Sequence, residues 1–162
     1  MNNDERIKDI VEEVIKILSE RKHPLVLTER REHAEIINQL LIENKIQTAI
    51  LRGGMSVKDR KTANEKLKVA QVVVATGKFV GEGFDLPRLD TLFLAMPIAW
   101  KGLLAQYAGR IHRESDGKTQ VTIVDYVDAS LPMLNRMFLK REKGYKAMGY
   151  KIIDAYKNIS DV

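Results

Sequence analysis

The chain has 162 residues and no cysteine, and its 27 lysines and arginines exceed its 22 aspartates and glutamates, which gives a formal net charge of +5. This length predicts one domain with a sizeable core, and the lack of cysteine excludes disulfides and thiolate metal sites. The three histidines lie far apart in the sequence, so no metal site is predicted. The charge suits binding to nucleic acid, or equally an ordinary solvated surface. No apolar run reaches the roughly 18–20 residues that span a bilayer, and no signal peptide is visible, so a cytoplasmic protein without membrane contact is expected.

Helical and strand patterns alternate along the chain. Apolar residues recur at helical spacing between residues 7 and 18, which predicts an amphipathic helix within an amino-terminal segment of residues 1–22. Helices are also predicted over 31–45 and 56–68, the second capped by Ser56. Short apolar runs predict strands over 24–27, 48–51, 72–75, 92–95 and 121–127.

These strands are apolar throughout and are mostly separated by helices of about a dozen residues, which favours strands buried on both faces. The predicted fold class is α/β, with a doubly wound, mostly parallel sheet that carries helices on both faces. Ligands of such sheets bind at the carboxyl ends of the strands, so a site is expected in the loops after the first strands. Those loops begin at Thr28, Arg52, Thr76 and Met96.

A closing helix is predicted after the last strand. Its apolar stripe is expected to pack in the core rather than to hold a cofactor. The stripe consists of Leu131, Leu134, Met137, Phe138 and Arg141, with Met133 beside them. Residues 144–162 are expected to form a short helical tail, so that residues 1–162 make up one domain.

The segment ATGKFVGEGFDLP, residues 75–87, follows a predicted strand and holds three glycines, with Asp85 two residues after Gly83. Glycines let backbone N–H groups approach an anion closely, so this loop is a candidate cradle for phosphate or ribose; the alternative is ordinary turn punctuation. Lys78 is followed by Phe79 rather than by serine or threonine, and the glycine spacing does not match a dinucleotide fingerprint. The chain therefore lacks a Walker A motif.

The segment QYAGRIHR, residues 106–113, sets Arg110 and Arg113 three residues apart. On a helix these two side chains would share one face, where like charges repel unless an anion lies between them. The planar guanidinium suits a phosphoryl group. The alternative is a surface pair, in which each arginine bonds its own carboxylate, such as Glu114 or Asp116.

Four segments, in this order, resemble the C-terminal RecA-like domain of superfamily two helicases and translocases. They are PLVLTERREHAEIINQLL, LRGGMSVKDR, VVVATGKFVGEGFDLPRLDTLFLAMP and LLAQYAGRIHR, and the last two resemble motifs V and VI. The resemblance runs from about Pro24 to Val127 and implies a RecA-like fold. It also implies that this chain is half of a motor, whose partner is the N-terminal RecA-like domain of the same enzyme. That domain would bind most of the ATP and Mg²⁺, since its phosphate loop and acidic motif are absent here.

The resemblance implies roles for two groups of residues. Arg110 and Arg113 would be arginine fingers on the γ-phosphate, with Gln106 organising that catalytic site. Gly83 and Asp85 would lie against the nucleotide. The nucleic-acid backbone would be contacted by Thr28, Arg30, Arg52, Gly53, Gly54, Thr76 and Lys78.

Two departures from RNA-unwinding DEAD-box proteins favour DNA as the nucleic acid. Motif VI begins with Gln106 rather than histidine, and motif V has Glu82 and Gly83 where Arg-Gly is usual. Both segments look more like the DNA translocases of restriction systems. The competing hypothesis is a non-enzymatic, doubly wound module that binds a phosphorylated ligand through the glycine loop.

Overall fold

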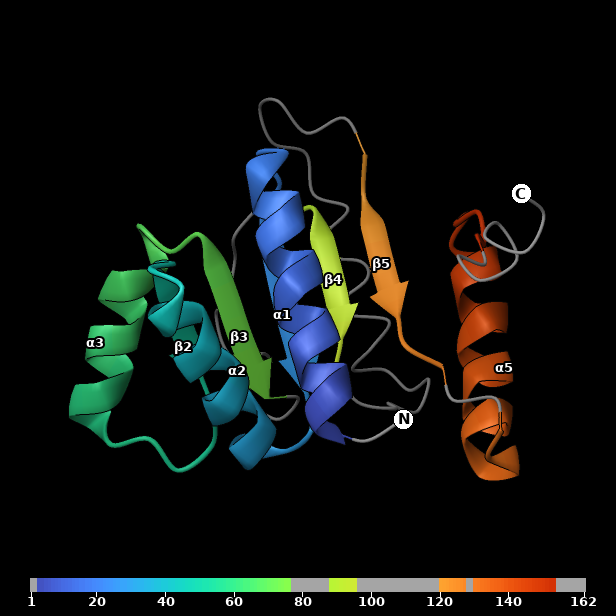
Figure 1. Ribbon diagram of the computed structural model, residues 1–162, viewed down its shortest axis with the longest axis horizontal. Helices are drawn as coiled ribbons and strands as arrows, with labels where there is room; N and C mark the ends of the chain where they lie inside the picture. Colours follow the sequence, from blue (N-terminus) through green and yellow to red (C-terminus); the bar gives the residue numbers. More distant parts are fainter. Residues whose placement is uncertain (1–2, 77–87, 96–119, 128–129, 154–162) are drawn as a thin grey trace.

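The computed structural model describes residues 3–76, 88–95, 120–127 and 130–153. Its helices are α1 (Asn3–Ser19), α2 (Arg31–Glu43), α3 (Val57–Leu67) and α5 (Pro132–Ala147). Its strands are β1 (Pro24–Thr28), β2 (Thr48–Leu51), β3 (Val72–Thr76), β4 (Thr91–Leu94) and β5 (Thr122–Asp125). The helices flank a single sheet whose strands all end at the same edge (Figure 1).

The sheet has five strands in the order β2-β3-β1-β4-β5, and every neighbouring pair is parallel. This confirms the predicted α/β class with a parallel sheet. Strand β1 is central and is hydrogen-bonded to β3 on one side and to β4 on the other. Consecutive strands β1 and β2 are not neighbours, because β3 lies between them, as expected for crossover connections through helices.

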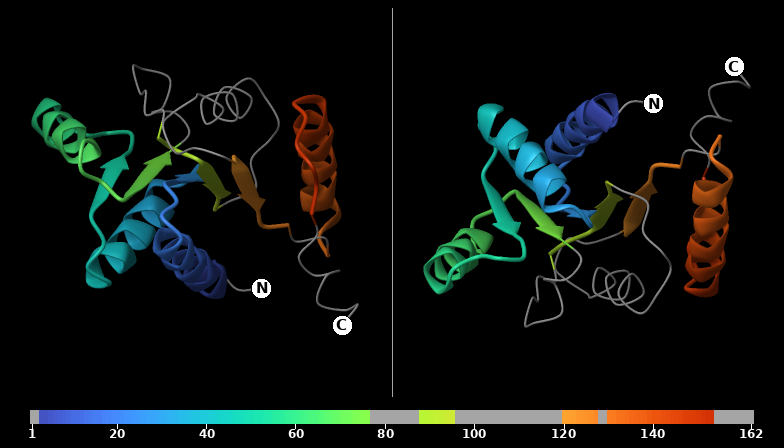
Figure 2. Two further views of the ribbon diagram at one scale, coloured as in Figure 1. Left: turned by 90° about the horizontal axis from the view of Figure 1, so that it is seen from above. Right: turned by 90° about the horizontal axis from the view of Figure 1, so that it is seen from below.

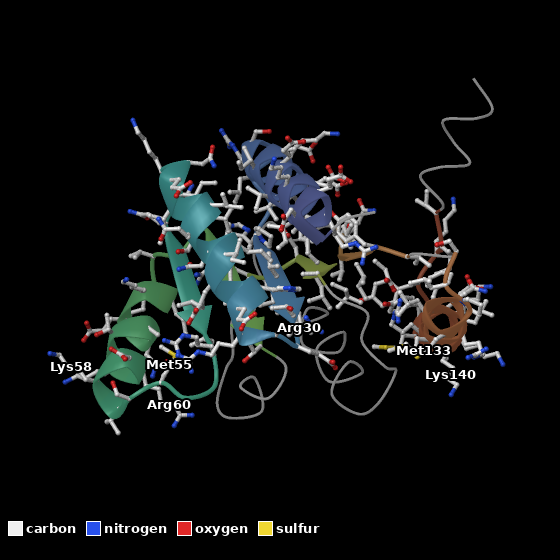
Figure 3. All side chains as sticks on the ribbon, turned by 60° about the horizontal axis from the view of Figure 1, so that its bottom comes forward. Arg30, Met55, Lys58, Arg60, Met133 and Lys140 are labelled. Atoms are coloured by element: carbon white, nitrogen blue, oxygen red, sulfur yellow. The ribbon has the colours of Figure 1, made fainter. Side chains whose placement is uncertain are left out.

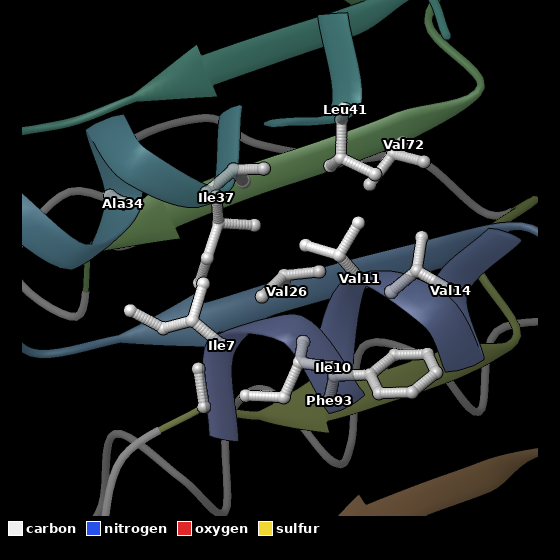
Figure 4. Close-up of a cluster of buried hydrophobic side chains, with 12 residues drawn as sticks. Ile7, Ile10, Val11, Val14, Val26, Ala34, Ile37, Leu41, Val72 and Phe93 are labelled. Carbon is white, nitrogen blue, oxygen red and sulfur yellow. The ribbon is translucent and has the colours of Figure 1, made fainter. Parts of the chain in front are cut away.

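Two hydrophobic layers cover the faces of the sheet, because successive strand residues point to opposite sides. Helices α1 and α2 lie on the same face (Figure 2), where Val26, Val74 and Phe93 pack against them. Figure 4 shows this layer in close-up, with Ile10 of α1 near Phe93 of β4 and Leu41 of α2 near Val72 of β3. Leu27 and its neighbours on alternate positions form the second layer, together with apolar residues of α3 and α5. Each such fully buried side chain contributes roughly 1.5–3 kcal/mol to folding.

The carboxyl-terminal part differs from the sequence prediction in three ways. Strand β5 is shorter than residues 121–127 and only partly buried, because it is the edge strand of the sheet. Helix α5 runs on to Ala147, so the predicted tail does not begin at 144, and Tyr145 is buried in the second layer. Leu131 and Met133 are 51% and 61% exposed, so the predicted packing stripe does not extend to them.

A buried ion pair joins α5 to the edge strand. The Arg141 guanidinium donates from Nε to Asp125 Oδ2 at 2.8 Å and from Nη2 to Asp125 Oδ1 at 3.0 Å. The Tyr145 hydroxyl donates to the same carboxylate at 2.8 Å. Arg141 is 1% exposed, and its guanidinium lies 5.8 Å from the centre of the Phe138 ring. The helix therefore docks through a charged network as well as through apolar contacts.

Asp90 organises the opposite, amino-terminal edge of the sheet. Its backbone N–H donates to the His23 carbonyl at 3.1 Å, and its carboxylate accepts from the His23 backbone N–H at 2.9 Å. The Thr91 hydroxyl donates to the same carboxylate at 2.9 Å, and the Thr122 N–H donates to the Asp90 carbonyl at 2.9 Å. These bonds tie together the starts of β1, β4 and β5.

Candidate nucleic-acid interface

The strand register brings the starts of three predicted loops together at the carboxyl edge of the sheet. Thr28 at the end of β1 lies directly beside Thr76 at the end of β3. Leu51, the last residue of β2, lies beside Ala75, so Arg52 leaves the sheet next to Thr76. The loops after β1, β2 and β3 therefore begin side by side, as the prediction for a parallel sheet requires.

The turn after β1 presents Arg30 to solvent. The Thr28 side chain is fully buried, and its Oγ1 accepts a hydrogen bond from the Arg30 backbone N–H at 3.3 Å. Arg30 has an extended backbone at the N-cap of α2 and makes no side-chain cap bond to the helix. Its exposed side chain lies at the carboxyl edge (Figure 3). Thr28 thus shapes the turn, while Arg30 is free to reach outward from it.

The loop after β2 contains Arg52, Gly53 and Gly54, and it bends back at once toward the start of α3. Gly54 has φ of +76°, a left-handed conformation in which residues with a β-carbon are strained. The Arg52 backbone N–H lies 3.5 Å from Met55 Sδ, and Arg52 Nη1 donates to the Gly53 carbonyl at 3.4 Å. The backbone of this loop is exposed at the two glycines, as a backbone that approaches a phosphate must be.

One carboxylate joins this loop to α2. Glu35 Oε1 lies 3.0 Å from Arg52 Nε and 3.3 Å from Arg31 Nε, so two guanidiniums share a single oxygen atom. The sequence analysis did not single out Arg31 or Glu35. Their spacing of four residues on a helix signals an ion pair, but nothing in the sequence indicates that Arg52 joins it.

Helix α3 adds positive charge beside this loop. Ser56 caps the helix by accepting a hydrogen bond from the Asp59 backbone N–H at 3.1 Å, which confirms the predicted cap. Lys58 and Arg60 follow in the first turns, and both are exposed (Figure 3). Two exposed cations, Lys58 and Arg60, therefore follow the loop after β2, with the exposed Asp59 between them.

Several predicted site residues lie outside the described residues. Lys78, Gly83 and Asp85 belong to the segment 77–87, and Gln106, Arg110 and Arg113 to the segment 96–119. Thr76, which leads into the first of these segments, is 7% exposed at the end of β3. Within the described ranges, no three histidine, aspartate or glutamate side chains are placed to hold a metal ion. Among the helices described, none is both long enough and apolar enough to cross a bilayer.

Comparison with known proteins identifies similar chains. The sequence profile of the family described as "Helicase conserved C-terminal domain" matches residues 5–115. Uncharacterized protein 108L of Invertebrate iridescent virus 3 is 38% identical over 84 residues, which make up 52% of this chain and 76% of that protein. UvrABC system protein B of Fervidobacterium nodosum is 25% identical over 138 residues, 81% of this chain but 20% of the relative's length. The crystal structure of T4 UvsW has a similar fold, with a TM-score of 0.66 and 19% identity over 88% of this chain and 32% of that one.

Proposed function

Because the chain belongs to the helicase conserved C-terminal domain family, we propose that it is the second motor domain of an ATP-dependent DNA helicase or translocase. The match covers about a fifth of the length of UvrABC system protein B. An enzyme of that length would contain further domains beside this one. In the proposed enzyme, an N-terminal RecA-like domain binds ATP and Mg²⁺, and this chain closes against it. The observation that carries the proposal is the alignment of the ends of β1, β2 and β3 at one edge of a parallel sheet, where Arg30 follows the first strand and Arg52, Gly53 and Gly54 follow the second.

The described part of this edge suits a phosphate backbone. Arg30 is exposed at the turn after β1, and Arg52 leads into the exposed backbone of Gly53 and Gly54. Guanidinium groups and free backbone N–H groups are the donors that bind phosphate oxygens in proteins. We assign the direct contacts to these residues and to Lys78, and we assign the buried Thr28 and Thr76 to shaping the two strand ends from which the loops leave.

The nucleotide half of the proposal rests on the motif V and motif VI sequences. Arg110 and Arg113 are proposed as the arginine fingers, with Gln106 orienting them and with Gly83 and Asp85 against the nucleotide. Phosphoryl transfer to water is accelerated mainly by positioning and by stabilising charge, so two guanidiniums from a second domain are a sufficient contribution. Bound ATP supplies the γ-phosphate on which they would act. We assign the Mg²⁺ ligands to the N-terminal domain. The charged side chains that we assign to phosphate are arginines and a lysine, which cannot bind a cation.

The proposal is tested by binding and by turnover. Fluorescence anisotropy with a short labelled duplex should show weak binding that depends on salt but not on sequence. About three phosphate contacts predict a slope of log K against log salt of roughly −2 to −3. Parallel titrations with duplex RNA test the assignment to DNA, which predicts tighter binding of the DNA duplex.

The purified chain alone should not hydrolyse ATP, since it has no Walker A motif. Hydrolysis should appear only when the chain is joined to its N-terminal RecA-like domain. Robust ATP turnover by the chain alone, or an affinity for the DNA duplex that does not change with salt concentration, would contradict the proposal. The second result would favour a small-ligand binding module instead.

A further inference from the structure

We infer that Glu35 is an internal stand-in for a nucleic-acid phosphate: it holds Arg31 and Arg52 together in the free domain and must be displaced when a phosphate binds between them. The inference rests on the proposed function and deepens it in two respects. It adds Arg31 to the phosphate-binding surface, and it makes Glu35 a residue that limits affinity.

The geometry is that of two cations on one oxygen atom. Glu35 Oε1 lies 3.0 Å from Arg52 Nε and 3.3 Å from Arg31 Nε. The two guanidiniums come from different elements, one from the start of α2 and one from the loop after β2. Without an anion between them they would repel each other, so the arrangement requires a negative group at this point.

The fold leaves room for this arrangement. A β-carbon on Gly54 would lie 3.0 Å from Arg31 Nη1, so the absence of a side chain at this position lets the guanidinium lie against the loop. Arg52 is held from its other side, where Nη1 donates to the Gly53 carbonyl at 3.4 Å. Both guanidiniums therefore lie against the same exposed glycine backbone that the proposed function assigns to phosphate.

The carboxylate is accessible to displacement. The Glu35 side chain is 47% exposed and that of Arg31 is 56% exposed, whereas Arg52 is 20% exposed. Ion pairs with such exposure are weak, because water and salt screen them. An incoming phosphate offers the same guanidiniums more acceptor oxygens, so it can replace Glu35 without any rearrangement of the sheet.

The test compares Glu35→Gln with Glu32→Gln in the 162-residue chain, using a short labelled DNA duplex. Both substitutions remove one negative charge from the first turns of α2, but within the described residues no ion pair joins Glu32 to an arginine. Glu35→Gln should tighten binding about three- to tenfold, as expected for the release of two exposed ion pairs. The salt slope should steepen by up to roughly 0.9, the contribution of one further phosphate. Glu32→Gln should change the affinity by less than about twofold.

A second comparison separates a specific role from a general change of charge. In an Arg31→Gln, Arg52→Gln background, adding Glu35→Gln should bring no gain, since the guanidiniums that it would release are gone. Glu35→Ala serves as a second variant, and circular dichroism melting checks that each variant is folded. An equal gain from Glu32→Gln, or a gain that persists without the arginines, would overturn the inference while leaving the proposed function intact. If neither wild type nor Glu35→Gln shows salt-dependent binding, the proposed function fails and the inference fails with it.

Discussion

Asp125 and Arg141 meet through two parallel hydrogen bonds, of 2.8 and 3.0 Å, and thereby join the edge strand β5 to helix α5. Arg141 is buried, and Asp125 is nearly so, with 11% of its side chain exposed. Breaking a buried ion pair by removing one member costs more than the pair itself contributes, because the remaining charge stays away from water.

Asp125→Asn is therefore expected to lower the free energy of unfolding by about 3 kcal/mol, as measured by urea denaturation. Glu142→Gln is the matched control, because it breaks the pair with Lys146 on the same helix at 3.1 Å, where the lysine is 61% exposed. The control should cost less than about 1 kcal/mol. Equal losses in the two variants would show that the Asp125 pair does not hold the helix in place.

Gly54→Ala should destabilise the domain by about 1 kcal/mol, because alanine is strained at the φ of +76° that this position adopts. The new methyl group would also displace the Arg31 guanidinium, which lies 3.0 Å from where it would sit. Gly53→Ala is the control, since a β-carbon there would meet nothing within 4 Å. Differential scanning fluorimetry of both variants gives the comparison, and a loss as large at residue 53 would argue against the conformational explanation.

The stability of the domain should fall at alkaline pH. Burial raises the pKa of Tyr150 from 10.0 to about 12. Burial and the neighbouring Asp125 carboxylate also raise the pKa of Tyr145. The folded state therefore holds the hydroxyl protons of these tyrosines more tightly than the unfolded state does. Their contribution to the free energy of unfolding is complete below pH 10 and is lost as the pH rises toward the pKa of the folded state.

Each such tyrosine should make the free energy of unfolding fall as the pH rises through that window. Tyr150→Phe should make the free energy of unfolding fall less steeply with pH, because one of the titrating groups is gone. Urea unfolding at a series of alkaline pH values measures this slope. A slope that is unchanged in this variant would mean that Tyr150 ionises equally easily in both states.

Arg110→Ala or Arg113→Ala, in the chain joined to its N-terminal RecA-like domain, should reduce ATP turnover by about 10³ to 10⁵. Affinity for nucleic acid should barely change, and lysine at either position should rescue poorly, because a point charge lacks the two parallel donors of arginine. Steady-state turnover of the joined protein and thermal melting of the chain alone provide the measurements. Turnover within a factor of about ten of wild type, or unfolding of either variant, would make these arginines structural.

Continuous apolar runs predicted the buried strands, because a strand covered on both faces needs apolar residues at every position. The same reasoning overestimated β5, where an edge position leaves part of the strand in water and its sequence alone does not indicate which strand is outermost. It also ended the closing helix too early at Gly144, a residue that often ends helices but here is buried inside one.

In the candidate site, too, some features were predictable from the sequence and others were not. Parallel strands end at one edge of a sheet, so the meeting of the loops at Thr28, Arg52 and Thr76 followed from the predicted topology. The contact between Glu35 and Arg52 did not, because it depends on how α2 lies against the loop after β2. Local spacing indicates pairs within a helix, whereas pairs between elements depend on tertiary packing.

Strand β1 is paired with a neighbouring strand on each side. It pairs with β3 from Leu25 opposite Val73 to Thr28 opposite Thr76. It pairs with β4 from Pro24 opposite Thr91 to Leu27 opposite Leu94. To slide Thr28 past Thr76, the domain would have to break this ladder and shear two closely packed layers. The ends of β1 and β3, at Thr28 and Thr76, must therefore move together as parts of one rigid body. In a motor that includes this domain, these two strand ends would therefore move only when the whole sheet moves, and the spacing between them would stay the same throughout the cycle.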